Sequence, residues 1–156
     1  MSKSLERVRQ ALAQAGVAAE ILEMDQSTRT AEEAAAAAGC EVDQIAKSII
    51  FRGEATGHIV LFLPAAGNRV NPEKASAVAG QKLGKADADL IRAETGFAIG
   101  GVAPVGHLTR VPCYLDPRLL DFARVWAAAG TPRHIVALAP EVLLSMTGAT
   151  VAAFTG

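Results

Sequence analysis

Hydrophobic residues near the start of the chain recur every three or four positions, which is the spacing of one helix face. Leu5, Val8 and Leu12 follow this spacing, and Gly16 comes directly after the pattern ends. The pattern predicts an amphipathic helix that stops at Gly16, because glycine is favoured at helix ends. Four more helices are predicted: a capped segment from Thr30 to Gly39, one beginning at Asn71 and Pro72, one over 87–94, and one from Pro140 to just before Gly148.

Between these helices, short runs of β-branched and other apolar residues predict strands. The strands cover residues 19–23, 45–51, 58–63, 113–116, 124–128 and 134–138. The runs at 45–51 and 58–63 flank a glycine-containing turn, which predicts a hairpin at the centre of the sheet. Helices and strands do not alternate in a regular βαβ order, so we expect an α+β fold with a mixed, mostly antiparallel sheet. No repeat or linker divides the chain, so residues 1–156 are expected to form a single domain.

Composition narrows the classes of function. The chain is 51% hydrophobic and 20% charged with a net charge of −1, which argues against nucleic-acid binding by bulk positive charge and leaves room for a local basic patch. Cys40 and Cys113 lie far apart, so neither a disulfide scaffold nor a zinc knuckle is predicted. The start of the chain lacks the apolar run of a signal peptide, and no run is long enough to span a membrane. We therefore expect a cytoplasmic protein.

The segment IGGVAPVG, residues 99–106, concentrates three glycines and a proline in eight positions. Its spacing fits neither the dinucleotide-binding fingerprint nor a Walker loop. One interpretation is a structural turn. The other is that Gly100 and Gly101 present bare N–H groups to a ligand carbonyl while Pro104 fixes the exit of the loop.

Lys47 interrupts the apolar run IAKSIIF, residues 45–51. Strand alternation places Lys47 on the same face as Ile49 and Phe51, with Ser48 on the other face. The lysine is then either a solvated surface residue or the cation of a cleft, where it would hold a phosphate or a carbonyl oxygen.

The remaining candidates give weaker signals. His107 and Cys113 suggest a thiol nucleophile, but Cys113 lies in a strand-like apolar run that favours a buried residue. His58 and His134 each begin a strand without ligand spacing, so no metal site is predicted. A basic segment is either a solvated surface or a contact for a nucleic-acid backbone; it contains Arg69, Lys74, Lys82 and Lys85 against Glu73.

Taken in order, several segments resemble the YbaK/ProX family of aminoacyl-tRNA deacylases, which is related to the editing insertion of bacterial prolyl-tRNA synthetases. These segments are STRTAEEAAAAAG, AKSIIF, HIVLFLPAAGNRV, TGFAIGGVAPVGH and VPCYLD. The matched motifs are Lys47 at the start of a central strand and the G-x-x-x-P loop from Gly100 to Pro104. The resemblance implies a curved sheet flanked by helices, with Lys47, Gly100, Gly101 and Pro104 as catalytic residues. By rough alignment it also implies a substrate pocket walled by Ser27, Thr28, Ser48, Gly130 and Thr131.

The resemblance further implies hydrolysis, in trans, of the ester that joins a wrong small amino acid to the 3′ adenosine of a tRNA. The partners would be the acceptor end of aminoacyl-tRNA and an aminoacyl-tRNA synthetase, with no cofactor, DNA or membrane. Cysteine-clearing relatives carry a polar SGG-type turn where this chain has Ala128, Ala129 and Gly130, so no single amino acid is assigned. Two alternatives stay open: a non-catalytic module that binds tRNA or a synthetase, and a hydrolase for another small ester or thioester.

Overall fold

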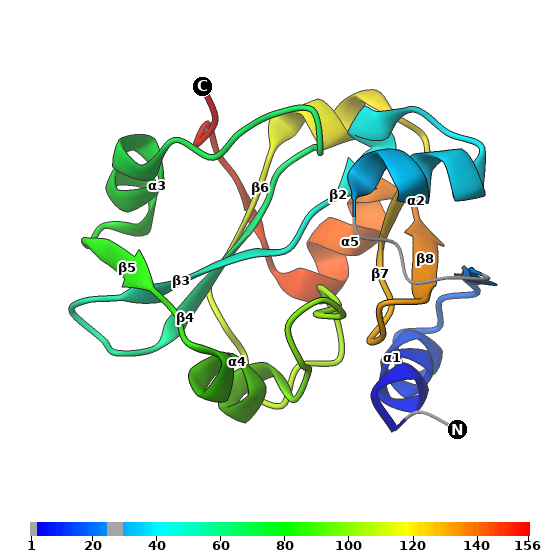
Figure 1. Cartoon of the computed structure of the whole chain (residues 1–156), viewed down its shortest axis with the longest axis horizontal. Coiled ribbons are helices and arrows are strands. Elements are labelled where there is room, and N and C mark those ends of the chain that lie inside the picture. Colours follow the sequence, from blue (N-terminus) through cyan, green and yellow to red (C-terminus); the bar gives the residue numbers. More distant parts are fainter. Residues whose placement is uncertain (1–2, 25–29) are drawn as a thin grey trace.

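Two β-sheets lie side by side and are covered by helices in the computed structural model, which describes residues 3–24 and 30–156 (Figure 1). The helices are α1 (Lys3–Gln14), α2 (Ala31–Ala38), α3 (Pro72–Ala79), α4 (Ala88–Thr95) and α5 (Pro140–Thr147), with 3₁₀ turns at Val42–Gln44 and Pro117–Asp121. The strands are β1 (Glu20–Glu23), β2 (Ile45–Ala46), β3 (Ile49–Gly53), β4 (Ile59–Leu63), β5 (Leu83–Lys85), β6 (Cys113–Leu115), β7 (Val125–Ala128), β8 (His134–Leu138) and β9 (Thr150–Val151).

The pairing of the strands confirms the α+β class and the mixed sheet. One sheet has the order β1-β8-β7-β2 and the other the order β5-β3-β4-β6-β9. The pairs β1–β8, β7–β8, β3–β4 and β3–β5 are antiparallel, and β2–β7, β4–β6 and β6–β9 are parallel. Figure 1 shows α3 beside the five-stranded sheet on the left, and α1 and α2 beside the four-stranded sheet on the right.

The predicted hairpin is confirmed as β3 and β4, but the single strand predicted over 45–51 is wrong. Ile45 and Ala46 pair with β7 in one sheet, whereas β3 pairs with β4 and β5 in the other. Lys47 and Ser48 lie at the crossing between the sheets. The Lys47 N–H donates to the Pro64 carbonyl (3.1 Å) and the Ser48 hydroxyl to the Val102 carbonyl (2.9 Å), so neither continues a regular ladder. The alternation inferred across this run therefore does not extend through it.

The helix boundaries follow the capping signals of the sequence. The Thr30 hydroxyl accepts from the Glu33 N–H (3.1 Å), and Gly39 ends α2 in the left-handed conformation, with φ of 69°. Asn71 caps α3 through the N–H groups of Glu73 and Lys74, and Pro72 occupies its first turn. These elements are fixed by contacts within four residues, which is why the sequence alone locates them.

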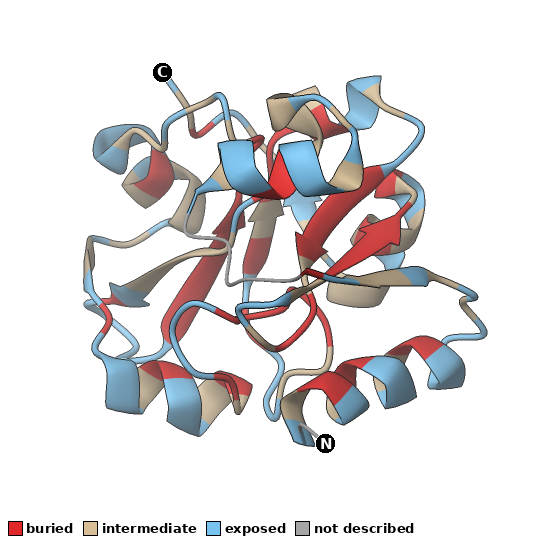
Figure 2. Ribbon diagram, turned by 45° about the vertical axis from the view of Figure 1, so that its right-hand side comes forward, coloured by how far each residue is buried: buried red, intermediate tan, exposed pale blue. Residues whose placement is uncertain are grey.

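Apolar residues on the inner faces of the helices and on the strands form the core (Figure 2). Both faces of the five-stranded sheet are covered. Alternate residues of β4 point to opposite sides: Leu61 and Leu63 pack toward α1 and α5, and Val60 and Phe62 pack with Phe154 and α3. A separate apolar cluster, which includes Trp126 and Ile135, joins α2 to the four-stranded sheet. The described helices include none that is long and apolar enough to cross a membrane.

Candidate active site

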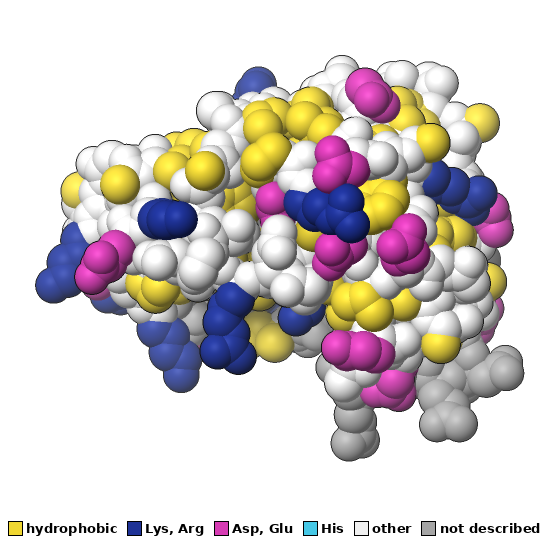
Figure 3. Space-filling view, turned by 90° about the horizontal axis from the view of Figure 1, so that it is seen from above, with side chains coloured by type: hydrophobic (Ala, Val, Ile, Leu, Met, Phe, Trp, Pro, Cys, Tyr) yellow, Lys and Arg dark blue, Asp and Glu magenta, His cyan; other side chains and the backbone are white. Residues whose placement is uncertain are grey.

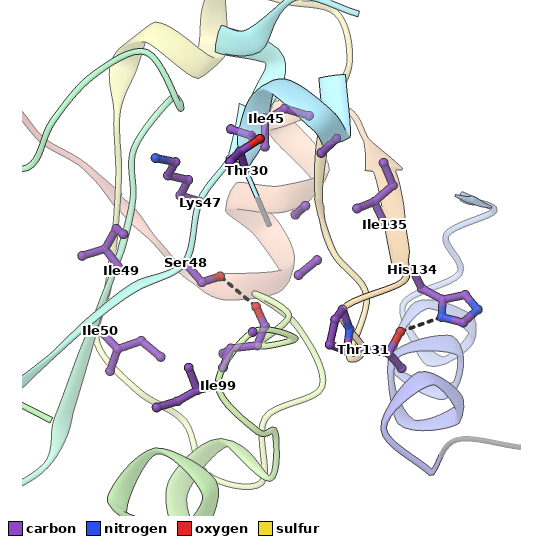
Figure 4. A pocket seen from close by; sticks show the side chains of 18 of the residues that line it. Thr30, Ile45, Lys47, Ser48, Ile49, Ile50, Ile99, Thr131, His134 and Ile135 are labelled. Atoms are coloured by element: carbon purple, nitrogen blue, oxygen red, sulfur yellow. Dashed lines mark hydrogen bonds between the residues drawn. The ribbon is translucent and has the colours of Figure 1, made fainter. Parts of the chain in front are cut away.

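A cavity of about 420 Å³ opens between the two sheets, and we call it the main cavity (Figure 4). Its walls come from α2, from α4, from the crossing between β2 and β3, from the glycine-rich loop, and from β7, β8 and the turn between them. The lining residues are Thr30, Ala31, Ala34, Ile45, Ala46, Lys47, Ser48, Ile49, Ile50, Ile91, Ile99, Gly100, Val102, Ala127, Ala128, Thr131, Pro132, His134 and Ile135. Apolar walls with a few polar groups are typical of a small-molecule site.

Lys47 lies at the edge of this cavity on the chain that connects the sheets. Its backbone is fixed by the hydrogen bond to Pro64, and its side chain is exposed. Within residues 3–24 and 30–156 no carboxylate pairs with its amine. In Figure 4 the side chain leaves the strand on the side of Ile49, away from Ser48. The ammonium is therefore available to an anionic or carbonyl ligand at the cavity edge.

Ser48 ties the strand crossing to the glycine-rich loop. Its hydroxyl donates its single proton to the Val102 carbonyl at 2.9 Å, as the dashed line in Figure 4 shows. The oxygen keeps its acceptor capacity, so it can accept a hydrogen bond from an ammonium or hydroxyl group in the cavity.

The two central glycines of the loop differ in what they offer. Gly100 lines the cavity with φ of 97°, and its N–H has no hydrogen-bond partner among the described residues. The Gly101 N–H instead donates to the Ala98 carbonyl at 3.1 Å, and Gly101 is buried. The prediction that Gly101 presents a bare amide is therefore wrong. This glycine serves close packing, because a Cβ there would lie 2.8 Å from the Thr131 Cα.

Two other predicted residues lie behind the cavity walls. Pro104 is buried and lines a separate cavity beside α1 and His107, so it supports the loop from behind without facing the main cavity. Gly130 packs on α1: its φ is 97°, and a Cβ would lie 2.7 Å from the Ser4 carbonyl oxygen. Of this turn, Thr131 reaches the cavity. Ser27 and Thr28, the other predicted wall residues, lie outside the described residues.

A hydrogen-bonded pair at the cavity wall was missed by the sequence reasoning. The Thr131 hydroxyl lies 2.6 Å from His134 Nδ1 (Figure 4) and accepts from the Arg133 N–H at 3.1 Å. His134 Nε2 lies 3.7 Å from a Glu23 carboxylate oxygen, which favours the tautomer with the proton on Nε2. The Thr131 hydroxyl then donates to Nδ1. The signal in the sequence was the T-x-x-H spacing within one turn, which a search for metal ligands overlooks.

The cysteines and His107 lie outside the main cavity. Burial raises the pKa of Cys113 to about 12, and burial also raises the pKa of Cys40. Both thiols are therefore protonated near neutral pH and are poor nucleophiles. His107 Nε2 lies 2.6 Å from the Ala103 carbonyl, and burial lowers the pKa of this histidine, which keeps it neutral. Across residues 3–24 and 30–156, no three His, Cys, Asp or Glu side chains are grouped so that they could hold a metal ion.

Comparison with known proteins places this geometry in a family. Residues 25–146 match the aminoacyl-tRNA editing domain. The chain is 33% identical over 141 residues to the uncharacterized protein YwhH of Bacillus subtilis, covering 90% of this chain and 88% of that protein. It is 29% identical over 126 residues to "Putative Cys-tRNA(Pro)/Cys-tRNA(Cys) deacylase EbsC" of Enterococcus faecalis, covering 81% and 77% of the two chains.

A solved structure extends the likeness over the full length. The "putative trans-editing enzyme for prolyl tRNA synthetase" superposes with a TM-score of 0.93 at 47% identity, covering 100% of this chain and 99% of that one. The family match spans the strand crossing with Lys47, the glycine-rich loop and the Thr131–His134 turn. This chain belongs to the aminoacyl-tRNA editing domain family.

Proposed function

We propose that this protein hydrolyses, in trans, the ester of a tRNA that carries a wrong small amino acid. The observation that carries the proposal is the meeting, at one apolar cavity, of Lys47 and the Gly100 N–H, which has no partner among the described residues. In this proposal the amino acid enters the cavity, and the terminal adenosine stays at its mouth. Ile99, whose surface is 63% exposed on the glycine-rich loop, offers the adenosine an apolar contact.

The chemistry needs little from the protein, because an aminoacyl ester is already activated. The Gly100 N–H donates to the ester carbonyl as negative charge develops on its oxygen, and Lys47 holds the ribose-phosphate end. The hydroxyl of a water molecule adds to the acyl carbon, the bond from that carbon to the ribose oxygen breaks, and the ribose oxygen takes a proton. The products are the free amino acid and uncharged tRNA. The neighbouring ribose hydroxyl of the substrate is placed to orient the water, so no protein nucleophile is required.

The walls of the main cavity support the proposed preference for small amino acids. Ala31, Ala34, Ala46, Ala127 and Ala128 provide room, whereas the surrounding isoleucines limit it. Polar groups are few, and the acceptor oxygen of Ser48 suits the ammonium of an aminoacyl group. Selection by size alone discriminates by about 1–3 kcal/mol per methylene, so several small amino acids are expected to be accepted to different degrees.

The test is a deacylation screen of the purified chain. Alanine, serine, threonine and cysteine are each attached to several tRNAs, and release of the labelled amino acid is compared with release in buffer and from correctly charged tRNAs. We expect release of at least one small amino acid well above the buffer rate, with correctly charged tRNAs largely spared. Tight binding of the same tRNAs without any hydrolysis would instead assign the chain to the non-catalytic alternative.

A further inference from the structure

A second groove lies on the other side of Lys47. It has a volume of about 470 Å³, and Lys47 and Ile49 line it as well as the main cavity. Its other walls include Phe51, Asn68 and Arg69, and none of the described residues that line it is acidic. The groove therefore combines two cations with an aromatic and aliphatic surface, which is the combination that binds single-stranded nucleic acid.

The turn that carries Arg69 is held firmly in place. Buried Asp116 accepts hydrogen bonds from the Ala65 N–H (3.0 Å) and from Asn68 Nδ2 (2.9 Å), and the Ala66 N–H donates to the Ile45 carbonyl (2.9 Å). After the turn, the Arg69 carbonyl accepts from the Gly156 N–H at 3.1 Å. The backbone of Arg69 is thus fixed at the groove, whereas its side chain is exposed and has no carboxylate partner among the described residues.

The charge around the groove differs from the charge of the whole chain. Residues 47–85, which include β3, β4, α3 and β5, carry six Lys or Arg and two Asp or Glu, although the net charge of the protein is −1. Seen from above, Lys and Arg side chains project from the half that holds α3, while Asp and Glu predominate over the other half (Figure 3). This local asymmetry favours the binding of a polyanionic strand on the surface of the five-stranded sheet.

The main cavity and the second groove, which we call the two compartments, share a wall at Lys47 and Ile49. This wall sets the order in which a bound strand would meet them. With the aminoacyl ester in the main cavity, the ribose-phosphate of the terminal adenosine lies at Lys47, and the preceding part of the strand continues into the second groove. Resting on the proposed function, we propose that the second groove binds the nucleotide that precedes the terminal adenosine. Its phosphate contacts Arg69, and its base or sugar packs on Phe51.

The test uses three substrates that end in the same mischarged adenosine: an aminoacyl-adenosine 5′-monophosphate, a dinucleotide ester that carries a phosphate at its own 5′ end, and the full tRNA. In the wild type, kcat/KM is expected to rise from the first to the second. Arg69→Ala should remove most of this rise, roughly three- to tenfold for one exposed charge-assisted contact, and leave the aminoacyl-adenosine unaffected. The slope of log(kcat/KM) against log[salt] should fall by about one for the tRNA.

The matched control is Arg52→Ala, which removes the same charge from β3 at a position next to Phe51 that points to the other side of the sheet. An Arg69→Ala effect that is equal on all three substrates, or no greater than that of Arg52→Ala, would overturn the proposal. If the wild type hydrolyses none of the substrates, the proposed function fails instead. Titration with a trinucleotide that carries no amino acid then still tests the second groove. Weaker binding by Arg69→Ala than by the wild type supports the proposal, and equal binding overturns it.

Discussion

The main cavity and the second groove share Lys47 but are built in opposite ways. Segments from five parts of the chain converge on the main cavity, and its walls are largely alanine and isoleucine. The second groove is made mostly by one continuous turn and the adjacent strand, and its polar side chains are basic or neutral. An apolar pocket distinguishes side chains by size, whereas a basic groove recognises a phosphate backbone without reading sequence. Under the proposed function, amino-acid selection and tRNA attachment are therefore assigned to two separate parts of this small scaffold.

The largest effect is expected from a change that moves a wall of the main cavity. Gly101 has an ordinary φ, but a Cβ there would meet the Thr131 backbone at 2.8 Å. Gly101→Ala should displace the loop that carries the Gly100 N–H and lower the deacylation rate by about 10²-fold, as small misplacements of reacting groups do. Single-turnover deacylation measures the effect. The control is Gly57→Ala, which introduces strain at a positive φ with open space around it. If a folded Gly101→Ala variant deacylates at the parental rate, the position of this loop does not determine catalysis.

The lysine that lines both compartments should give the next largest effect. Lys47→Ala is expected to lower kcat/KM by at least about tenfold, which is roughly 1.4 kcal/mol of transition-state binding, on every substrate that retains the terminal phosphate. Lys82→Ala removes an equally exposed lysine of the same half and should change little. If the two variants behave alike, Lys47 is a solvated surface residue.

A smaller effect is expected where a hydrogen bond only orients a ring in the cavity wall. Thr131→Val keeps the shape of the side chain and removes the contact with His134 Nδ1, so kcat/KM should fall about fivefold, in keeping with the loss of one hydrogen bond. Thr147→Val is the matched control, because the Thr147 hydroxyl bonds the Leu143 carbonyl within α5, away from the main cavity. Equal effects of the two substitutions would reduce the Thr131–His134 pair to a structural contact.

The smallest effect concerns stability and is expected at His107, which lines a separate cavity beside α1. Burial lowers the pKa of His107 below its usual value of 6.5, so the unfolded chain binds this proton more readily than the folded chain does. The contribution of neutral His107 is thus fully present above pH 6.5 and is lost as the pH falls below it. His107→Gln keeps a donor for Ala103 without titrating, so its stability should fall less steeply between pH 7.5 and pH 5 in denaturant titrations. Parallel curves for the two proteins would contradict this.

Local signals in the sequence predicted much of the fold. The caps at Thr30 and Asn71 and the β3–β4 hairpin depend on neighbouring residues, and the structure confirms them. The break at Lys47 was not predictable, because it depends on Pro64 and on the distant Val102 carbonyl. Strands β5 and β9 were missed because three and two residues are too short to show alternation.

The candidate site was predictable only in outline. The motifs at Lys47 and Gly100 bring together two groups that line one cavity. The sequence could not show that the Gly101 N–H is already bonded to Ala98, or that Pro104 and Gly130 face away from the cavity. Nor could it show the approach of His134 to Thr131, which only the turn between β7 and β8 produces. Hydrogen-bond partners and side-chain directions depend on contacts that form only when the chain folds, so the sequence alone does not show them.

The most direct test of the two-compartment account crosses one variant in each compartment with two series of substrates. Ala128→Val narrows the main cavity at a half-buried strand position, and Arg69→Ala removes a cation from the second groove. The measurement is kcat/KM for tRNAs that carry amino acids of increasing size, and for esters of increasing nucleotide length. We expect Ala128→Val to change only the dependence on amino-acid size and Arg69→Ala to change only the dependence on nucleotide length. If each variant alters both dependences equally, the two compartments are one undivided site and the account is contradicted.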